Sequence, residues 1–213
     1  VKDKKKAATD RTVVLSRITP KPAWRVSCGT LYRSDNRGPD IIFPHGFSAR
    51  DVKGGTYDVE DYVLLNQPSP YVSTSYDHDL YKNWASGFHY YIDAPGGLDV
   101  NKTIGDQHIY ANEVEVAFPG GIKTEYIIGV CPVDKATKTE IMSDCESNPA
   151  YKPGTDPSTA CRADALQAPR ATRSTDLSHP DPGTTNTGRR GEAPSSTSPH
   201  HTRGPGLGPQ EKK

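Results

Sequence analysis

The stretch Glu113-Val114-Glu115-Val116-Ala117-Phe118-Pro119-Gly120-Gly121-Ile122 decides how the rest of this sequence is interpreted. It predicts a short β-strand that ends in a Pro-Gly-Gly turn. Side chains alternate between the two faces of a strand, so Glu113 and Glu115 are predicted to share one face. Neighbouring carboxylates repel each other and are poor strand formers, so local propensity does not explain the pair. The pair indicates either a solvated strand face or a site that stabilises positive charge and orients a nucleophile.

The overall charge hides an uneven distribution along the chain. The 213 residues carry no net charge, and 33% of them are hydrophobic, which is low for a fully globular protein. Residues 24–145 hold 10 Lys and Arg against 17 Asp and Glu, whereas residues 1–23 hold 7 against 2 and residues 146–213 hold 9 against 7. We interpret these as a basic lead-in, an acidic central domain and a tail. An acidic central domain is poorly suited to binding phosphate backbones.

No apolar run is as long as a membrane span, and the N-terminus lacks the hydrophobic core of a signal peptide. The chain begins with Val rather than Met, so we expect a mature or excised form in which a missing signal says nothing about secretion.

Four cysteines are spaced widely, at Cys28, Cys131, Cys145 and Cys161. They show no Cys-x-x-Cys spacing and no paired His, so no metal site is predicted. They are typical of two disulfides in an exported protein, and three connectivities are possible. Of these we favour Cys28–Cys131 with Cys145–Cys161. Buried free thiols in a cytosolic protein are the alternative.

Short elements are predicted along the central domain. The pattern predicts strands at 30–35, 71–75, 88–92 and 125–130, a helical turn at 40–43, helices at 59–65 and 77–85, and a loop at 98–112. Period two places Ser73 and Ser75 on one face of their strand. The lead-in 1–23 is predicted to be mostly unstructured, with a possible strand at 13–15, and the tail from Arg162 to be disordered because it cannot bury a core.

Three motifs occur in order along the chain: an Arg on a strand, a Ser-Thr-Ser on a strand and a Glu-x-Glu. This pattern resembles the mono-ADP-ribosyltransferases of the cholera and heat-labile enterotoxin type. The first motif lies in Leu31–Asp40, followed by Ile42-Phe43 and Gly46-Phe47, and the second is Tyr71–Ser75. The third is Glu113–Ile122, and Ala94–Asn101 resembles a segment of the secreted toxin-like members. The resemblance covers about Thr30 to Val130.

This resemblance implies an α+β fold in which two packed antiparallel sheets, with short flanking helices, surround an NAD cleft. It also implies that NAD+ is the ADP-ribose donor, with no metal. Glu115 would stabilise the oxocarbenium ion left when the nicotinamide–ribose bond breaks, and Ser73 would hold the rotamer of Glu115. Arg33 would bind the diphosphate bidentately, and Asp35 and Arg37 would orient Arg33 or the entry loop. The neighbouring residues Tyr32, Thr74 and Ser75 complete the predicted cofactor site.

The acceptor class follows from Glu113, because in the family a Glu at this position goes with arginine acceptors and a Gln with Asn, Cys or nucleobases. Glu113 would bind a guanidinium and withdraw its proton, with Tyr110 as an aromatic platform. The predicted partner is therefore a protein that bears an acceptor arginine, with DNA less favoured. Guanine in DNA is the alternative, because Val116–Gly121 and Ala94–Gly97 also resemble the DNA-modifying branch.

Two departures from the family pattern bear on function. Tyr62 occupies the position where cholera-type enzymes often carry His, and no long amphipathic helix follows Cys161, so no B pentamer is expected. Secretion or delivery into a target cell is expected for a toxin-like member. An NAD glycohydrolase and a secreted binding module with an inactive transferase fold are further hypotheses, although Arg33, Ser73 and Glu115 are all present.

Overall fold

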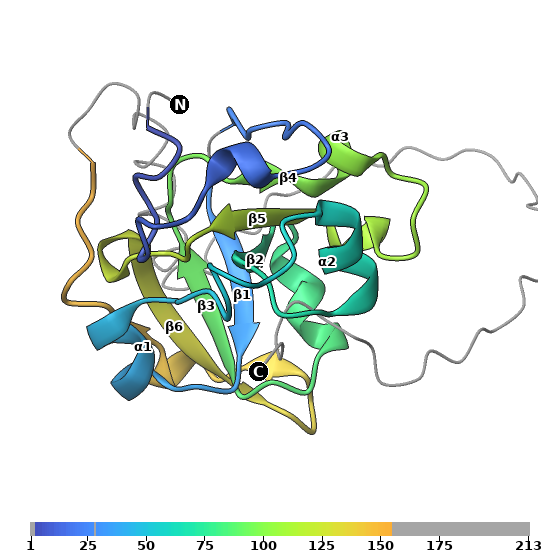
Figure 1. The fold of residues 1–213 in the computed structure, drawn as a ribbon. Helices are drawn as coiled ribbons and strands as arrows, with labels where there is room; N and C mark the ends of the chain where they lie inside the picture. The colour runs from blue at the N-terminus through green and yellow to red at the C-terminus, as the bar shows by residue number, and fades with distance from the viewer. Residues whose placement is uncertain (1–2, 28, 155–213) are drawn as a thin grey trace, which may run out of the picture.

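One antiparallel sheet organises the described residues, 3–27 and 29–154, of the computed structural model (Figure 1). Its strands are β1 (Leu31–Asp35), β2 (Tyr71–Ser75), β3 (Phe88–Ile92), β4 (Leu98–Asp99), β5 (Glu115–Pro119), β6 (Ile127–Asp134), β7 (Thr139–Glu140) and β8 (Glu146–Ser147). Their order is β4-β5-β2-β1-β3-β6-β7, and β8 pairs with β6. The predicted α+β class is confirmed.

The backbone pairing between β1 and β2 is much shorter than the pairing of either strand with its other neighbour. These strands share the single registered pair Tyr32–Ser75, whereas β1 pairs with β3, and β2 with β5, over five residues each. This short pairing divides the sheet into two halves. One half is β4-β5-β2, and the other is built on β1, β3 and β6, three strands that lie side by side in Figure 1. These halves correspond to the two predicted sheets.

Short helices flank the sheet: α1 (Pro39–His45), α2 (Val59–Leu65), α3 (Val100–Ile104) and the 3₁₀ helices η1 (Leu15–Arg17), η2 (His78–Asn83), η3 (Ala111–Glu113), η4 (Thr124–Tyr126) and η5 (Met142–Asp144). Aspartate side chains cap α2, η2 and α3 by accepting backbone N–H bonds, with Asp58, Asp77 and Asp99 as the caps. The segment predicted as a loop, 98–112, therefore contains β4 and α3, and the helix predicted after Asp77 is a 3₁₀ helix.

The two larger of three apolar clusters lie one on each side of the β2–β5 region, and the smaller third holds Tyr91, Ile128 and Cys131. The first includes Leu31, Ile42, Phe47, Tyr90, Ile92, Phe118 and Ile127. The second includes Val13, Ile18, Tyr57, Val59, Tyr62, Tyr71, Leu98 and Val100. Because α2 contributes Val59, Tyr62 and Val63 at helical spacing, its buried face holds Tyr62 against the sheet.

The lead-in is ordered from residue 3, contrary to the prediction of a mostly unstructured segment. Ala7, Ala8, Val13 and Ile18 are all buried. Asp10 N–H donates to the carbonyl of Gly120, so the lead-in covers the Pro-Gly-Gly turn. Gly120 has φ +84, and a Cβ there would lie 2.5 Å from the Asp10 carbonyl, so the close approach requires glycine.

The predicted tail also begins inside ordered structure, because β8 pairs with β6 and Asn148 is buried. Two predictions concern residues outside the described ranges. One is that the segment from Arg162 is disordered, and the other is that no long amphipathic helix for a B pentamer follows Cys161. Among those described, no helix is long and apolar enough to span a bilayer.

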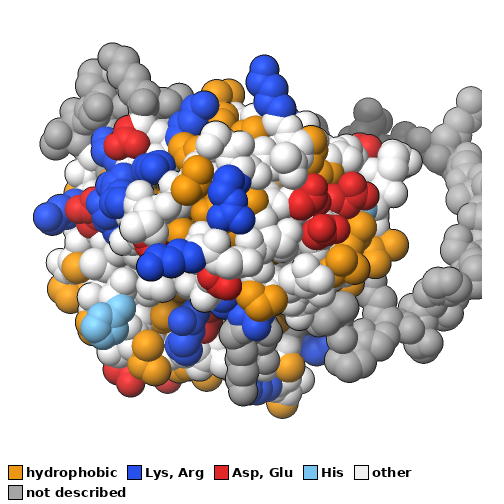
Figure 2. Space-filling view, viewed as in Figure 1, with side chains coloured by type: hydrophobic (Ala, Val, Ile, Leu, Met, Phe, Trp, Pro, Cys, Tyr) orange, Lys and Arg blue, Asp and Glu red, His pale blue; other side chains and the backbone are white. Residues whose placement is uncertain are grey.

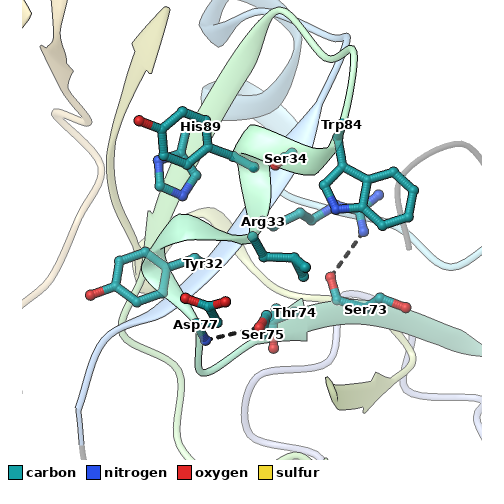
Figure 3. A pocket seen from close by; sticks show the side chains of 11 residues that line it. Tyr32, Arg33, Ser34, Ser73, Thr74, Ser75, Asp77, Trp84 and His89 are labelled. Atoms are coloured by element: carbon teal, nitrogen blue, oxygen red, sulfur yellow. Dashed lines mark hydrogen bonds between the residues drawn. The ribbon is translucent and has the colours of Figure 1, made fainter. Parts of the chain in front are cut away.

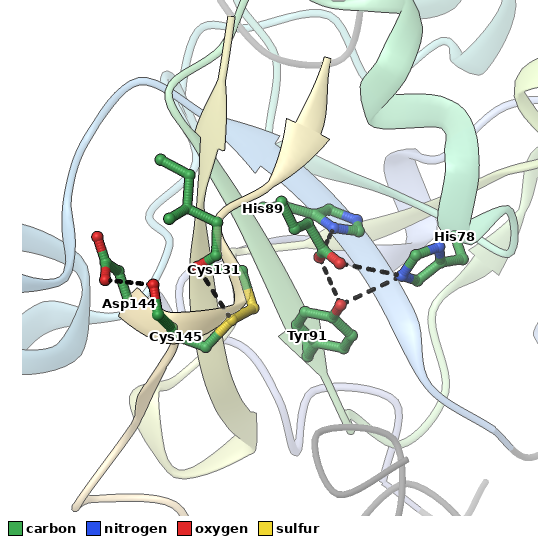
Figure 4. Close-up of a disulfide and its surroundings, with 9 residues drawn as sticks. His78, His89, Tyr91, Cys131, Asp144 and Cys145 are labelled. Carbon is green, nitrogen blue, oxygen red and sulfur yellow. Dashed lines mark hydrogen bonds and ion pairs between the residues drawn. A yellow bond between two sulfur atoms is a disulfide. The ribbon is translucent and has the colours of Figure 1, made fainter. Parts of the chain in front are cut away.

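A disulfide joins Cys131 on β6 to Cys145 at the end of η5 (Figure 4). The pairing of β8 with β6 at Gly129 and Val130 returns the chain to β6, which places Cys145 beside Cys131. The predicted pairings Cys28–Cys131 and Cys145–Cys161 are therefore wrong, because sequence spacing does not show where a strand returns.

Replacing both Cys131 and Cys145 by Ala should lower the melting temperature. The bond closes a loop with a sequence separation of 14. A loop of this length contributes about 3 kcal/mol in the chain-entropy model, or about 10 °C for a domain of this size. Calorimetry of the double variant checks this, and NAD hydrolysis at 25 °C should persist. An unchanged melt would contradict the expected stabilisation.

Candidate active site

A pocket opens where β1 and β2 diverge beyond the Tyr32–Ser75 pair (Figure 3). Its walls are Tyr32, Arg33, Ser34, Ser73, Thr74, Ser75, Asp77, Leu80, Tyr81, Trp84 and His89. The Arg strand and the Ser-Thr-Ser strand thus meet at one pocket, as the family resemblance implied.

Glu115 lies at the start of β5 and is only 6% exposed. Its Oε1 accepts a hydrogen bond from Ser73 Oγ at 2.5 Å and another from the Tyr62 hydroxyl at 2.8 Å. Burial raises the pKa of Tyr62 well above its ordinary value, so this hydroxyl stays a donor. Within the described part of the chain Oε2 has no hydrogen-bond donor, so one carboxylate oxygen is fixed and the other can meet a ligand.

Glu113 does not lie on the strand, contrary to the prediction. It ends η3, and Val114 follows in the left-handed region with φ 40, a strained conformation for a β-branched residue. The Ser75 hydroxyl donates to the Glu113 carbonyl at 2.7 Å, and the Val114 N–H donates to the carbonyl of Ala111. Strand alternation therefore does not relate Glu113 to Glu115, and the turn instead sets where the buried Glu113 side chain lies.

Arg33, Asp35 and Arg37 form one charged cluster beside the pocket. Asp35 Oδ2 accepts from Arg33 at 3.0 Å and from Arg37 at 2.7 Å. Burial would raise the pKa of Asp35, but hydrogen bonds from Arg37 and the charge of Arg33 outweigh it and lower the pKa. Arg33 also donates to the Ser73 carbonyl at 2.9 Å, so its guanidinium spans the gap between β1 and β2. Two guanidiniums share one carboxylate, which leaves a net positive charge for an anionic ligand.

The other predicted residues divide between the pocket and its frame. Thr74 Oγ1 donates to the Val116 carbonyl at 2.8 Å and so ties β2 to β5. Ser75 holds the η3 turn, as described above. Tyr32 faces the pocket and contacts the ring of His89. Tyr110 immediately precedes η3 and packs against the second core cluster.

Several residues of the site were not predicted: Tyr62, which contacts Glu115, and the pocket residues Ser34, Asp77, Leu80, Tyr81, Trp84 and His89. Tyr62 was set aside as a replacement for His, yet its spacing from Val59 and Val63 is the signal that it faces the sheet. His89 Nδ1 lies 2.5 Å from Glu140 Oε1, and His78 Nε2 lies 3.7 Å from Glu140 Oε2 (Figure 4). These three side chains could hold a metal ion by their proximity, although hydrogen bonds already link their atoms.

Comparisons with known proteins agree on the relatives of this chain. A "Guanine-specific ADP-ribosyl transferase" of Streptomyces coelicolor is 72% identical over 152 residues, covering 71% of this chain and 74% of that protein. A solved guanine-specific ADP-ribosyltransferase with NADH and GDP is 69% identical, with a TM-score of 0.70, covering 72% of this chain and 97% of that one. The Scabin toxin from Streptomyces scabies in complex with NADH is 65% identical, with a TM-score of 0.72, covering 72% and 94%.

These relatives overturn the prediction of an arginine acceptor on a target protein, and with it the lower rank given to DNA. The structure differs from two premises of that prediction. Glu113 lies in a turn rather than on the strand where the acid pair was placed. The basic lead-in packs on the acidic domain, and Lys and Arg lie over the left and the middle of the face shown in Figure 2. The net charge of residues 24–145 therefore did not describe the assembled surface.

The resemblance to cholera-type enzymes predicted the reaction correctly, which is transfer of ADP-ribose from NAD+. The family is a different one. The model of the Scabin-like family matches residues 31–151, which is more than half of the chain. The chain belongs to the Scabin-like family and is an NAD-dependent ADP-ribosyltransferase.

Proposed function

We propose that this protein transfers ADP-ribose from NAD+ to guanine. The observation that carries the proposal is the 72% identity to a protein named a guanine-specific ADP-ribosyl transferase. The site fits the donor, because the Arg33–Asp35–Arg37 cluster offers net positive charge to a diphosphate and Glu115 keeps Oε2 available.

Glu115 supplies the fixed negative charge at the bond that breaks. The positive charge that develops on the ribose is stabilised by a preorganised carboxylate in a site that excludes water. Ser73 and Tyr62 both donate to Oε1 and so set the rotamer of Glu115, which leaves Oε2 directed to the ribose hydroxyl. Arg33 and Arg37 bind the diphosphate, and Arg37 is the more exposed of the two.

Glu113 recognises the acceptor base. A carboxylate carries only hydrogen-bond acceptors, and guanine presents two adjacent donors, N1–H and the exocyclic amine. Adenine presents an acceptor next to its amine, so the same carboxylate would meet a lone pair. Glu113 thereby selects guanine and takes the proton that the amine loses as it attacks the ribose. Tyr110, at the start of the same turn, offers a stacking surface for the base.

We assign the protein to an oxidising compartment, with export or delivery into a target cell. The Cys131–Cys145 disulfide supports this, because such bonds persist outside reducing cytosol.

The test of the proposal uses NAD+ with GMP, IMP, AMP and agmatine as separate acceptors, and mass spectrometry finds the adduct. Only GMP should gain ADP-ribose, because IMP lacks the exocyclic amine and AMP presents the wrong donor pattern. Guanine-containing DNA is the second acceptor to assay. Transfer of ADP-ribose to agmatine or AMP, together with no transfer to GMP, would overturn the proposal.

Tyr62→Phe should lower kcat for NAD hydrolysis about tenfold, because Glu115 Oε1 then keeps only Ser73 as a donor. The dissociation constant for NADH should change little. Tyr71→Phe is the matched control, because it also removes a buried hydroxyl, which donates to the Tyr57 carbonyl and not to Glu115. That variant should lose thermal stability and keep kcat. Equal loss of kcat in both variants would show that Tyr62 acts only through packing.

A further inference from the structure

Three side chains from separate elements meet beside the pocket between β1 and β2. His78 is the first residue of η2, His89 lies on β3 and Glu140 ends β7. One nitrogen of each histidine and one oxygen of the carboxylate all lie within 4.8 Å of one another. Figure 4 shows the rings of His78 and His89 directed toward each other. Because 51 residues separate His89 from Glu140, no metal-binding motif in the sequence reveals this group.

Strand register fixes the buried part of this group. His89 on β3 pairs with Cys131 on β6. Two residues along β6, Val133 pairs with Glu140 on β7. Paired residues of antiparallel strands share a face of the sheet, as do residues two apart on one strand, so His89 and Glu140 face the same side. The Cys131–Cys145 disulfide closes the loop that carries β7, so a covalent bond also restricts the position of Glu140.

Glu140 is a buried carboxylate whose neighbours are two imidazoles and a phenol. Its side chain is 7% exposed. Its oxygens lie 2.5 Å from His89 Nδ1 and 3.7 Å from His78 Nε2, and the Tyr91 hydroxyl donates to it. Within the described part of the chain, no Lys or Arg forms an ion pair with this carboxylate. Buried carboxylates are normally paired with a cation or bind a metal, so this position favours a cationic ligand.

His78 is oriented in the way that metal-binding histidines are. Its Nδ1 donates to Asp79 Oδ1 at 2.9 Å, so its Nε2 presents a lone pair on the side of Glu140. Histidines that bind metals typically donate the other ring N–H to a carboxylate, which fixes both tautomer and orientation. The side chains of His78 and Asp79 are 40% and 61% exposed, so an ion can enter from solvent on this side.

The kinds of donor atom select the class of metal. Two imidazole nitrogens and one carboxylate oxygen are typical of zinc sites with an open fourth position, whereas Mg²⁺ and Ca²⁺ prefer oxygen ligands. Tetrahedral zinc with bonds of about 2.0–2.2 Å places its ligand atoms roughly 3.3–3.5 Å apart. The separation of 3.7 Å between His78 Nε2 and Glu140 Oε2 is close to that value. The ion would take the place of the proton that His89 Nδ1 and Glu140 share.

We propose that His78 Nε2, His89 Nδ1 and the Glu140 carboxylate bind one zinc ion, with the Tyr91 hydroxyl beside the fourth position. The ion links η2 and β7 to β3 and so stiffens the pocket wall that Leu80, Tyr81 and His89 form. It goes beyond the proposed function, because no step of the transfer passes through the ion.

Calorimetric titration of zinc chloride into the full chain tests the site. The chain carries His200→Ala and His201→Ala, because adjacent histidines bind zinc by themselves. A single zinc ion should bind, and the melting temperature should rise by about 5–10 °C at a free zinc concentration about 100 times Kd. Cobalt chloride in place of zinc should give the intense visible absorption of tetrahedral cobalt.

His78→Ala in this background should weaken zinc binding by about 100-fold or more, because it removes a ligand. Asp79→Ala should weaken it by about 10–100-fold, because it removes only the group that orients His78. Glu140→Gln should lose the cobalt absorption. His45→Ala is the matched control, because His45 is an exposed histidine at the end of α1 and should bind zinc no differently from the background. Thermal melts without metal verify that each variant folds.

Equal zinc affinity in His78→Ala and in the background would overturn the inference. A cobalt spectrum that Glu140→Gln leaves unchanged would do the same, because the ion would then lie elsewhere. These measurements use neither NAD+ nor an acceptor base, so a failure of the proposed function would leave their outcome unaffected.

Discussion

Glu115→Gln is expected to abolish both ADP-ribose transfer and NAD hydrolysis, while NADH binding stays within a few-fold of the wild type. The substitution keeps the shape and the hydrogen bonds that Oε1 can accept from Ser73 and Tyr62, and it removes the charge. Loss of one preorganised charge at the transition state costs about 10²–10³ in rate or more. Nicotinamide release measured by chromatography gives the hydrolysis rate, and calorimetry gives the binding.

Glu60→Gln provides the control for this variant, because it makes the same chemical change on the exposed side of α2. It should keep wild-type hydrolysis. If Glu115→Gln hydrolysed NAD at nearly the wild-type rate, Glu115 would take no part in the chemistry and its buried contacts would be purely structural.

Glu113→Ala is expected to lose guanine transfer about 10²-fold and to keep most of the NAD hydrolysis. Discrimination by a bidentate pair to a base amounts to about 1–3 kcal/mol, and loss of a general base adds to it. Breaking the nicotinamide bond needs Glu115 and its two donors, which this variant leaves in place. Parallel assays of GMP adduct and free nicotinamide on the same samples give the two rates.

Glu113→Gln is the conservative partner of this variant, because its amide oxygen can still accept one N–H of guanine. It should retain intermediate transfer. The backbone carbonyl that Ser75 holds is unchanged in both variants, so the η3 turn should persist. Hydrolysis that falls in step with transfer in Glu113→Ala would show that Glu113 serves the donor site instead.

The sequence placed motif residues correctly in the fold where they lie on regular strands. Arg33 and Ser73 needed only the period of a strand and a known order of motifs, and both line the pocket that the structure contains. Glu113 was placed wrongly because the left-handed backbone of Val114 cannot be inferred from a β-branched residue, whose propensity favours strand. One unexpected backbone dihedral therefore misplaced a side chain in the site.

Contacts between distant segments were the other source of error. Tyr62 reaches Glu115 across 53 residues, and His89 reaches Glu140 across 51. The Cys131–Cys145 bond depends on the return of β8 to β6. The lead-in was predicted to be unstructured from its charge, yet its few apolar residues, Ala7, Ala8, Val13 and Ile18, are the ones that become buried. None of these contacts has a local signature.

Because β1 and β2 share only the Tyr32–Ser75 pair, side chains supply the other contacts that hold these two strands together. Beyond that pair no registered backbone ladder links the two strands, and the Arg33 guanidinium bridges them by its bond to the Ser73 carbonyl. Separating β1 from β2 beyond the Tyr32–Ser75 pair therefore breaks a side-chain contact and leaves the five-residue ladders on either side intact. The width of the cleft is in this way adjustable without unfolding any strand, and the residue that closes it is the same arginine that faces the donor.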